Sequence, residues 1–308
     1  MYYENITQLI GDTPLLKLNN IIKDKELKAN IFAKVEFFNP GGSVKDRIAK
    51  GMFFAAIENG DIKEDTVIYE PTSGNTGIGA ALVGAALGYK VVIVMPESVS
   101  VERIQIVKAY GAEVILTDKA DGMKGAIAKV QQLLSENENS VTLSQFENYE
   151  NPTTHFNTTA REIIKDLNGE VDVVVSGVGT GGTVTGIATY FNDLELDTEI
   201  IAVEPTLSAV ISGNEPSPHK IAGIGAGFIP NVLNVELLDR IIQIDDEDAI
   251  ETANYLARTE GVFSGISSGA ALAAAIQVAQ DEKYEGKNIV VILPDTGERY
   301  LSTGAFGQ

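Results

Sequence analysis

Apolar residues fall into two alternating patterns along most of this chain. Short continuous apolar runs, as at residues 67–69, 91–95 and 171–176, predict buried strands. Longer stretches with apolar residues three and four positions apart, as at 124–134 and 249–259, predict helices. Strands that are apolar on both faces and alternate with helices indicate parallel sheets with helices on each side. We therefore predict an α/β fold with two doubly wound domains and parallel-rich sheets.

The remaining predicted elements continue this alternation, and two irregular stretches interrupt it. Further strands are expected at residues 31–38, 113–117, 200–203 and 289–293. One further helix is expected to begin at residue 44 and another to end near residue 87, and others are expected at 101–110, 158–167, 184–191 and 269–279. Residues 204–230 contain four prolines and little periodicity, which predicts a long loop. A second, less regular stretch near residues 144–151 suggests a domain boundary. We predict an N-terminal region, 1–147, that contains a smaller mobile domain (about 40–147) and a first segment packed on the larger domain, 148–308.

Composition and charge exclude several classes of function. The net charge of −20 argues against nucleic acid and against an anionic membrane surface, because both require a basic face. The chain has no cysteine and only two histidines, which lack metal-ligand spacing, so no disulfide and no metal site are expected. The first residues lack the basic and apolar regions of a signal peptide, and no apolar run is long enough to span a membrane, so we expect a cytoplasmic protein.

One lysine lies where a predicted strand passes through a turn into a helix. Residues 39–47 read Asn-Pro-Gly-Gly-Ser-Val-Lys-Asp-Arg, and the prolyl-glycyl pair requires a turn. Lys45 then falls in the first turn of the helix, where the helix dipole disfavours a cation. By spacing alone, a solvated surface lysine is the leading interpretation. A lysine with a chemical role is the alternative.

Three glycine-rich segments follow other strands. Residues 72–77 read Thr-Ser-Gly-Asn-Thr-Gly and open a helix, so their hydroxyl and N–H groups suit an anion such as a carboxylate. Residues 177–183 read Gly-Val-Gly-Thr-Gly-Gly-Thr, which suits a terminal phosphate. The same residues satisfy G-x-G-x-x-G, and Glu204 could be the acidic ribose ligand of a dinucleotide site. Residues 265–269 read Gly-Ile-Ser-Ser-Gly, where Ser268 is expected to cap the helix and Ser267 keeps a free hydroxyl.

These segments together fit one cofactor. Ligands of open parallel sheets bind at the carboxyl ends of the strands, and all four segments are expected at such ends. A lysine, a phosphate-binding loop, a carboxylate-binding turn and a lone serine fit pyridoxal 5′-phosphate bound to an amino-acid-processing lysine.

At these residues the chain resembles the cysteine synthase/cystathionine β-synthase family of fold type II, tryptophan synthase β-like pyridoxal phosphate enzymes. The resemblance covers nearly the full length and includes Gly-Ile-Gly-Ala-Gly-Phe-Ile-Pro at 223–230 and Pro-Asp-Thr-Gly-Glu-Arg-Tyr-Leu-Ser-Thr at 294–303. It implies that Lys45 forms the Schiff base, Asn75 binds the cofactor's 3′-oxygen, Ser267 faces the pyridine nitrogen, and the phosphate is held by Gly179, Thr180, Gly181, Gly182 and Thr183. It also implies a substrate carboxylate site with Thr72, Ser73, Gly74, Thr76 and Gln145, and an amine side lined by Gly223 and Gly225.

The resemblance further implies a reaction and partners. The implied reaction is β-replacement, in which O-acetyl-L-serine and sulfide give L-cysteine and acetate through an aminoacrylate intermediate. A cystathionine β-synthase-like enzyme that condenses serine or O-acetylserine with homocysteine uses the same residues and stays open. A nicotinamide-binding protein and a regulatory protein that binds a partner's C-terminal peptide are further alternatives. The family implies a homodimer and a possible complex with the C-terminus of serine acetyltransferase.

Overall fold

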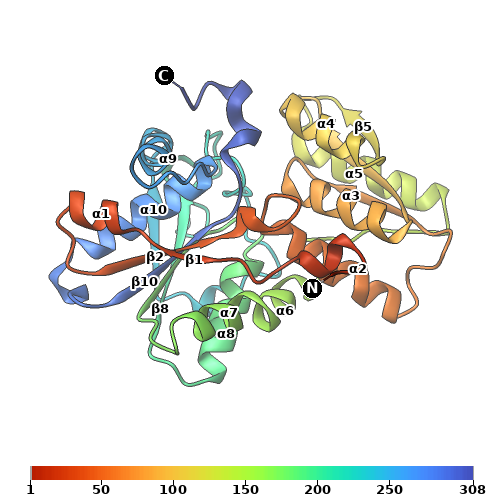
Figure 1. The fold of residues 1–308 in the computed structure, drawn as a ribbon. Helices are drawn as coiled ribbons and strands as arrows, with labels where there is room; N and C mark the ends of the chain where they lie inside the picture. Colours follow the sequence, from red (N-terminus) through yellow and green to blue (C-terminus); the bar gives the residue numbers. More distant parts are fainter. Residues whose placement is uncertain (1, 308) are drawn as a thin grey trace. The chain divides into compact units, whose positions relative to one another are not determined.

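The computed structural model describes residues 2–307, which form two compact units (Figure 1). The small unit contains residues 2–11 and 39–151, and the large unit contains residues 12–38 and 152–307. Each unit has its own sheet and its own apolar core. The boundary predicted near residue 147 and the mobility of the smaller domain stay predictions.

The small unit is built on four parallel strands in the order β5-β4-β3-β6. The strands are β3 (Val67–Pro71), β4 (Lys90–Pro96), β5 (Glu113–Thr117) and β6 (Ser140–Val141), and the helices are η1 (Ile6–Leu9), α2 (Lys45–Glu58), α3 (Asn75–Leu87), α4 (Val101–Ala109) and α5 (Gly122–Glu136). Alternate residues of β4 enter different clusters, because successive side chains of a strand point to opposite faces. Ile93 packs in the cluster of α2 and α3, whereas Val94 packs against α5.

The large unit is built on six strands in the order β1-β2-β10-β7-β8-β9, and only the β1–β2 pair is antiparallel. Its strands are β1 (Leu15–Lys17), β2 (Asn30–Val35), β7 (Val173–Gly177), β8 (Glu199–Pro205), β9 (Arg240–Ile244) and β10 (Asn288–Leu293). Its helices are α1 (Asn19–Asp24), α7 (Thr159–Asp166), α8 (Gly182–Asp193), α9 (Asp246–Glu260) and α10 (Ile266–Ala279), and α6 (Glu150–Asn157) begins in the small unit. Short 3-10 turns are η2 (Glu36–Phe38), η3 (Thr206–Ser208), η4 (Val235–Leu237), η5 (Glu282–Tyr284) and η6 (Gly297–Thr303).

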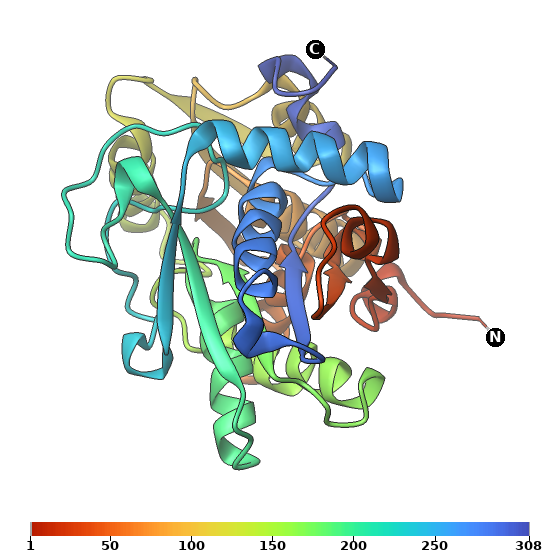
Figure 2. The same cartoon turned by 90° about the vertical axis from the view of Figure 1, so that its left-hand side faces the viewer.

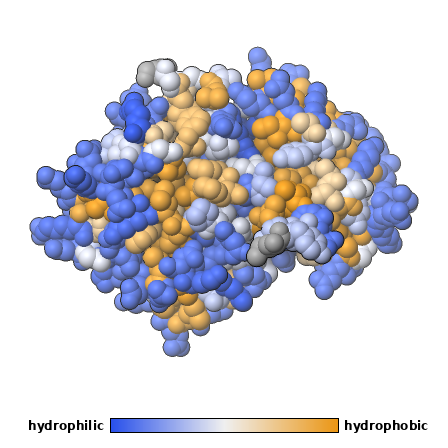
Figure 3. Space-filling view, viewed as in Figure 1, coloured by the Kyte–Doolittle hydropathy of each residue, from blue (hydrophilic) through white to orange (hydrophobic). Residues whose placement is uncertain are grey.

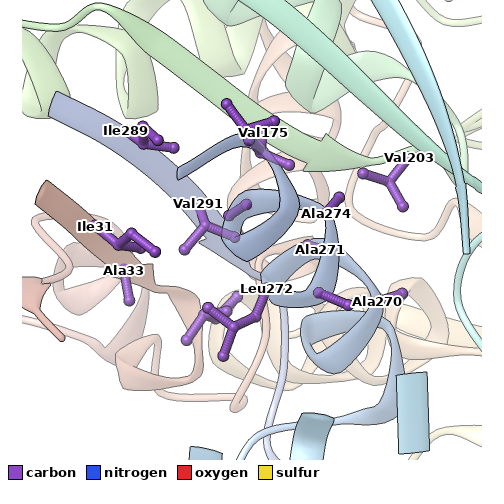
Figure 4. Close-up of a cluster of buried hydrophobic side chains, with 14 of the residues drawn as sticks. Ile31, Ala33, Val175, Val203, Ala270, Ala271, Leu272, Ala274, Ile289 and Val291 are labelled. Atoms are coloured by element: carbon purple, nitrogen blue, oxygen red, sulfur yellow. The ribbon is translucent and has the colours of Figure 1, made fainter. Parts of the chain in front are cut away.

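Helices cover both faces of the six-stranded sheet. Figure 1 and Figure 2 show α9 and α10 on one side of this sheet and α7 and α8 on the other. Val175 and Val291 point to α10, where they meet Ala271 and Leu272 (Figure 4). Their neighbours along the strands, such as Val174, instead join the cluster of α7 and α8. This double burial explains why the strands are continuous apolar runs in the sequence.

The predicted fold class is confirmed, with local differences. The strand expected over residues 31–38 ends at Val35, and the chain continues as the 3-10 turn η2. The strands β1, β6 and β9 and the helices α1 and α6 were not predicted. β1, β6 and α1 are too short to show a clear period, whereas β9 is as long as the predicted strand β5 and was missed. Residues 204–230 contain little regular structure beyond the end of β8 and η3, as expected.

The surface and the helix lengths bear on membrane association. Hydrophilic side chains are spread over both units on the face drawn in Figure 3, with apolar side chains between them. Within residues 2–307, no helix has both the length and the apolar character that a membrane span requires.

Candidate active site

Lys45 is the first helical residue of α2 and is half-buried, so its predicted place in the first turn is confirmed. Its backbone N–H donates to Ser43 Oγ at 3.2 Å. The preceding turn is closed by Asp46, whose Oδ2 accepts a hydrogen bond from Gly41 N at 2.6 Å. A methyl group on Gly41 would lie 2.5 Å from Asp46 Oδ1, so only glycine fits this position. The Pro-Gly-Gly turn is therefore held rigidly at the base of α2.

Helix α3 packs closely on the start of α2. A methyl group on Gly79 would lie 3.0 Å from the carbonyl oxygen of Lys45 and 3.1 Å from Ala49 Cβ, which shows how near the two helices approach. Gly79 is one helical turn after Asn75, the first residue of α3. The structure therefore brings the first turn of α2 beside the helix that the Thr72–Thr76 turn opens.

The Thr72–Thr76 turn leaves β3 and is tied to a distant segment. Gly74 N donates to Thr72 Oγ1 at 3.0 Å, and Gly74 precedes the first helical residue of α3. The hydroxyl of Thr76 donates to Gln145 Oε1 at 2.6 Å, across 69 positions of sequence. Because Oε1 accepts this bond, Gln145 Nε2 keeps its two N–H donors, and it makes no hydrogen bond to the residues that the structure describes. Ser73 is exposed beside them.

The Gly179–Thr183 loop of the large unit joins β7 to α8. Gly181 precedes the helix with a φ of +85°, a conformation that favours glycine. A methyl group on Gly179 would lie 2.4 Å from Gly223 O. The backbone N–H groups at this helix N-terminus and the hydroxyls of Thr180 and Thr183 can bind an anion such as phosphate.

Sequence reasoning missed a histidine behind this loop. His155 is fully buried, and its Nε2 lies 3.1 Å from Thr183 Oγ1 while its Nδ1 lies 2.8 Å from Thr159 Oγ1. The histidine therefore sets the direction of the Thr183 hydroxyl. His155 and Thr183 are 28 positions apart and lie on different helices, so no local pattern links them.

Gly223, Gly225 and Ser267 lie next to this loop. Gly225 N donates to Val178 O at 3.0 Å, which fixes the second loop against the first. A methyl group on Gly223 would lie 3.6 Å from Ser267 Oγ. Ser267 is the second residue of α10 and is buried, and its hydroxyl makes no hydrogen bond among the described residues. The structure therefore places the phosphate-type loop, the Gly223–Gly225 segment and Ser267 at one end of the large unit.

Ser268 does not have its predicted role. Helix α10 begins at Ile266 after Gly265, so Ser268 lies inside the first turn and does not cap the helix. Its buried hydroxyl has no hydrogen-bond partner among the described residues. The helix starts earlier than expected because Gly265 N donates to Asp295 O at 2.9 Å, which holds the residue before the helix at the end of β10.

The position of Glu204 argues against the dinucleotide interpretation of this loop. Glu204 is buried at the end of β8 and accepts hydrogen bonds from Ile211 N at 2.8 Å, Ser212 N at 3.0 Å and Ser212 Oγ at 2.5 Å. A carboxylate engaged in this way is not available to a ribose hydroxyl. The adjacent glycine loop therefore fits a terminal phosphate better than a dinucleotide.

The small unit contains a second buried glutamate near the candidate residues. Glu70 lies in β3 and is fully buried, and burial raises the pKa of its carboxyl from 4.5 to about 7. Hydrogen bonds donated by residues 142–145 oppose this rise of the pKa. Glu70 is thus partly protonated near neutral pH.

One described cavity lies away from these residues. It has a volume of about 660 Å³ and lies at the amino ends of β7 and β8, opposite the glycine loops. Its charged lining residues pair with one another, as Lys283 does with Glu199 at 3.1 Å and Lys287 with Asp172 at 2.7 Å. Among residues 2–307, no group of three or more His, Asp or Glu side chains is placed to hold a metal ion.

The residues present fit pyridoxal phosphate. The N–H groups of the Gly179–Thr183 loop at the start of α8 suit a phosphate, and the unengaged Ser267 hydroxyl suits a polar ring atom. Lys45 supplies an amine, and the free N–H groups of Gln145 suit the carboxylate of an amino acid. The contacts within each unit therefore agree with the cofactor expected from the sequence.

The fold and these loops define an α/β enzyme with the tryptophan synthase β-like, fold type II architecture. The family model described as "Pyridoxal-phosphate dependent enzyme" matches residues 6–295. The chain therefore belongs to this family, and its cofactor is pyridoxal phosphate. The resemblance found in the sequence is confirmed.

Relatives and solved structures agree over nearly the whole chain. A cysteine synthase of Staphylococcus aureus is 50% identical over 301 residues, which are 97% of this chain and 96% of that protein. The crystal structure of a cysteine synthase from Entamoeba histolytica has a TM-score of 0.95 and 44% identity, covering 99% of this chain and 91% of that one. An O-ureido-L-serine synthase structure has a TM-score of 0.95 and 39% identity, covering 99% of this chain and 96% of that one.

Proposed function

We propose that this enzyme converts O-acetyl-L-serine and sulfide to L-cysteine and acetate. The observation that carries this proposal is the Thr76–Gln145 hydrogen bond of 2.6 Å. It leaves the Gln145 amide N–H groups to bind the carboxylate of an amino acid, close to the helix that packs on the start of α2. The 50% identity to a protein named cysteine synthase supports the same reaction.

The proposed cofactor contacts are those that the family resemblance implies. Pyridoxal phosphate, when bound, supplies the electron sink that stabilises negative charge at the substrate Cα. The N–H groups and hydroxyls of Gly179–Thr183 hold the phosphate, and Asn75 binds the 3′-oxygen. Ser267 faces the ring nitrogen with a neutral hydroxyl, which does not keep that nitrogen protonated as a carboxylate would. A less electron-withdrawing ring favours prompt loss of the leaving group from Cβ.

The proposed substrate site orients the amino acid. Thr72, Ser73, Gly74, Thr76 and Gln145 bind its carboxylate, and Gly223 and Gly225 line the amine side. The hydroxyl of Thr72 and the amide of Gln145 supply donors whose directions are set by the contacts described above. Fixing the carboxylate in this way fixes the direction of the Cα–H bond, which must point at the base.

Lys45 has two proposed roles. It would anchor the cofactor through Nζ, and its amine, once free of the cofactor, would take the proton from the substrate Cα. The Cβ–O bond then breaks and acetate leaves. Sulfide forms the new Cβ–S bond, and Lys45 returns the proton to Cα to give L-cysteine.

The test of the proposed function separates the first half of the reaction from the second. Purified holoenzyme is mixed with O-acetyl-L-serine alone, and release of one acetate per active site is expected before any sulfide is added. Sulfide or homocysteine is then added, and the products are identified by mass spectrometry. Cysteine formed faster than cystathionine supports the proposal, whereas faster formation of cystathionine favours the homocysteine-using alternative. Failure to release acetate contradicts the proposal and leaves only the alternative that uses serine.

We also propose a cytoplasmic homodimer that binds the C-terminus of serine acetyltransferase, as the family resemblance implies. Exposed apolar residues at Leu207, Phe228 and Ile229 support the peptide complex, because they follow β8 in the same unit as Gly223. Sedimentation equilibrium tests the dimer. A titration with the acetyltransferase C-terminal peptide, followed by competition with O-acetyl-L-serine, tests the complex.

A further inference from the structure

Glu70 attaches a distant segment of the small unit to the end of β3. One carboxylate oxygen, Oε2, accepts hydrogen bonds from Thr142 Oγ1 at 3.0 Å, Leu143 N at 3.0 Å and Ser144 N at 3.2 Å. Backbone pairing between β6 and β3 ends just before this point, at the Ile68–Val141 pair. Beyond the last backbone pair, the Glu70 side chain attaches the chain to β3, because it accepts hydrogen bonds from the next three residues, 142–144.

The attached segment has an unusual backbone conformation. Ser144 has a φ of +54°, in the left-handed region that residues other than glycine rarely adopt. Such a conformation persists only where the surroundings hold it. Ser144 N is held by Glu70, and Ser144 O accepts from Glu147 N and Asn148 N at 2.9 Å each. The next residue is Gln145, so the direction of its side chain depends on this turn.

Burial of the Glu70 carboxylate is costly. Its other oxygen, Oε1, is buried without a hydrogen-bond partner among the described residues, and burial of a carboxylate is unfavourable. The pKa of about 7 reflects the same cost. An apolar residue would avoid this cost but would leave the donors of residues 142–144 without their acceptor. What the carboxylate provides is a fixed position for these residues.

A second buried glutamate, Glu204, accepts a similar set of hydrogen bonds in the large unit. Glu204, like Glu70, directly precedes the proline that ends its strand, and it also accepts two backbone N–H groups and one hydroxyl. Both glutamates therefore hold the segment that follows or neighbours the carboxyl end of a parallel strand. They differ in what they hold, because only the Glu70 segment leads directly into Gln145.

We propose that Glu70 is a positioning residue for substrate binding, because its carboxylate fixes residues 142–144 and so holds the Gln145 amide where it takes the substrate's carboxylate. This inference rests on the proposed function, in which Gln145 binds O-acetyl-L-serine. Glu70 itself does not touch substrate. A change at Glu70 should therefore weaken the binding only of ligands that carry a carboxylate.

The test compares two ligands in matched variants. Glu70→Gln keeps the shape but removes the charge, and Glu113→Gln removes the charge of an exposed glutamate in the same unit. O-acetyl-L-serine is compared with 2-aminoethyl acetate, which has the same amine and ester but no carboxylate. KM and kcat are measured for the first ligand, and a dissociation constant is measured for the second from the change in cofactor absorbance.

Because an amide oxygen accepts these hydrogen bonds more weakly than a carboxylate oxygen does, we expect KM for O-acetyl-L-serine to rise about tenfold in Glu70→Gln, with kcat within about twofold of wild type. The affinity for 2-aminoethyl acetate should not change, and Glu113→Gln should match wild type for both ligands. Equal KM values in Glu70→Gln and wild type would overturn the proposal, and so would an equal loss of affinity for both ligands. If Glu70→Gln does not fold, Thr142→Val removes one of the three donors and should raise KM about twofold to threefold, and an unchanged KM there would count against the proposal.

The proposed function fails in a distinguishable way. If wild-type enzyme neither releases acetate from O-acetyl-L-serine nor binds it, the proposed reaction is wrong. If wild-type enzyme turns over and only the ligand comparison fails, the role of Glu70 is wrong and the reaction stands.

Discussion

Replacement of Glu70 by glutamine should change how the stability of the protein depends on pH. Glu70 is fully buried, and its carboxyl has a pKa of about 7 in the folded protein against 4.5 as the ordinary value. The folded state therefore binds the proton more tightly than the unfolded state does. The resulting stabilisation is complete below pH 4.5 and is lost as the pH rises through 7.

The magnitude follows from the difference between the two pKa values. A difference of one pKa unit corresponds to about 1.4 kcal/mol, so the shift from 4.5 to about 7 corresponds to about 3 kcal/mol of lost stability. Most of this loss, about 2–3 kcal/mol, falls between pH 5 and pH 8; the remainder falls below pH 5, where the unfolded carboxyl begins to ionise. Glutamine has no charge, so its side chain adds no such dependence.

The assay is urea unfolding of wild type and Glu70→Gln at pH 5, 6, 7 and 8, followed by far-UV circular dichroism. The variant has a constant packing cost at every pH, so the informative quantity is the change with pH in the difference between the two free energies of unfolding. This difference should move in favour of Glu70→Gln by about 2–3 kcal/mol from pH 5 to pH 8. Glu113→Gln, where the glutamate is exposed, serves as the control. A difference that stays constant with pH, or moves in favour of wild type, would refute the reasoning.

Three further changes test the candidate site. Lys45→Ala should lower turnover by about 10³-fold or more and remove the covalent cofactor absorbance without unfolding the protein; near wild-type turnover would disprove its assignment. Ser267→Asp should slow β-replacement at least about tenfold, because a buried carboxylate beside the ring nitrogen favours its protonated form, and stopped-flow kinetics identical to wild type would exclude that contact. Gly179→Ala places a methyl group 2.4 Å from Gly223 O, so we expect about 1–3 kcal/mol of lost stability and weaker cofactor binding, measured by thermal unfolding and by titration of the apoenzyme. An Ala variant as stable as wild type, with unchanged cofactor affinity, would show that this close approach is not needed.

Much of the architecture was predictable because the signal is local. Continuous apolar runs such as β4 indicate strands that are buried on both faces. The glycine turns before α3 and α8 follow from the residue types alone. The placement of Lys45 at the start of α2 was predictable for the same reason, since the Pro-Gly-Gly turn must end the preceding segment. Errors arose where an interaction from elsewhere sets a boundary. The start of α10 before Ser268, for example, is fixed by a hydrogen bond to Asp295.

The candidate site was predictable as a set of residue types, but its contacts were not. The Thr76–Gln145 hydrogen bond joins residues 69 positions apart, and only the pairing of β6 with β3 brings them together. His155 lies behind Thr183 because α6 and α8 pack closely at Gly186, where a methyl group would lie 2.3 Å from Pro152 O. Neither contact has a sequence pattern, since each depends on where two separate elements cross.

The sequence by itself determined the α/β class, the doubly wound sheets, the glycine turns and the one lysine placed at a helix start, because each depends on neighbouring residues. It also supplied the family resemblance, which rests on short motifs. The tertiary structure alone decided what the buried carboxylates do. Glu70 and Glu204 stand before a proline in the same local sequence, yet Glu70 accepts hydrogen bonds from residues 142–144 and Glu204 accepts them from residues 211 and 212, only seven and eight positions away. A buried charge is tolerable only where such donors meet it, and their meeting is a property of the packed chain.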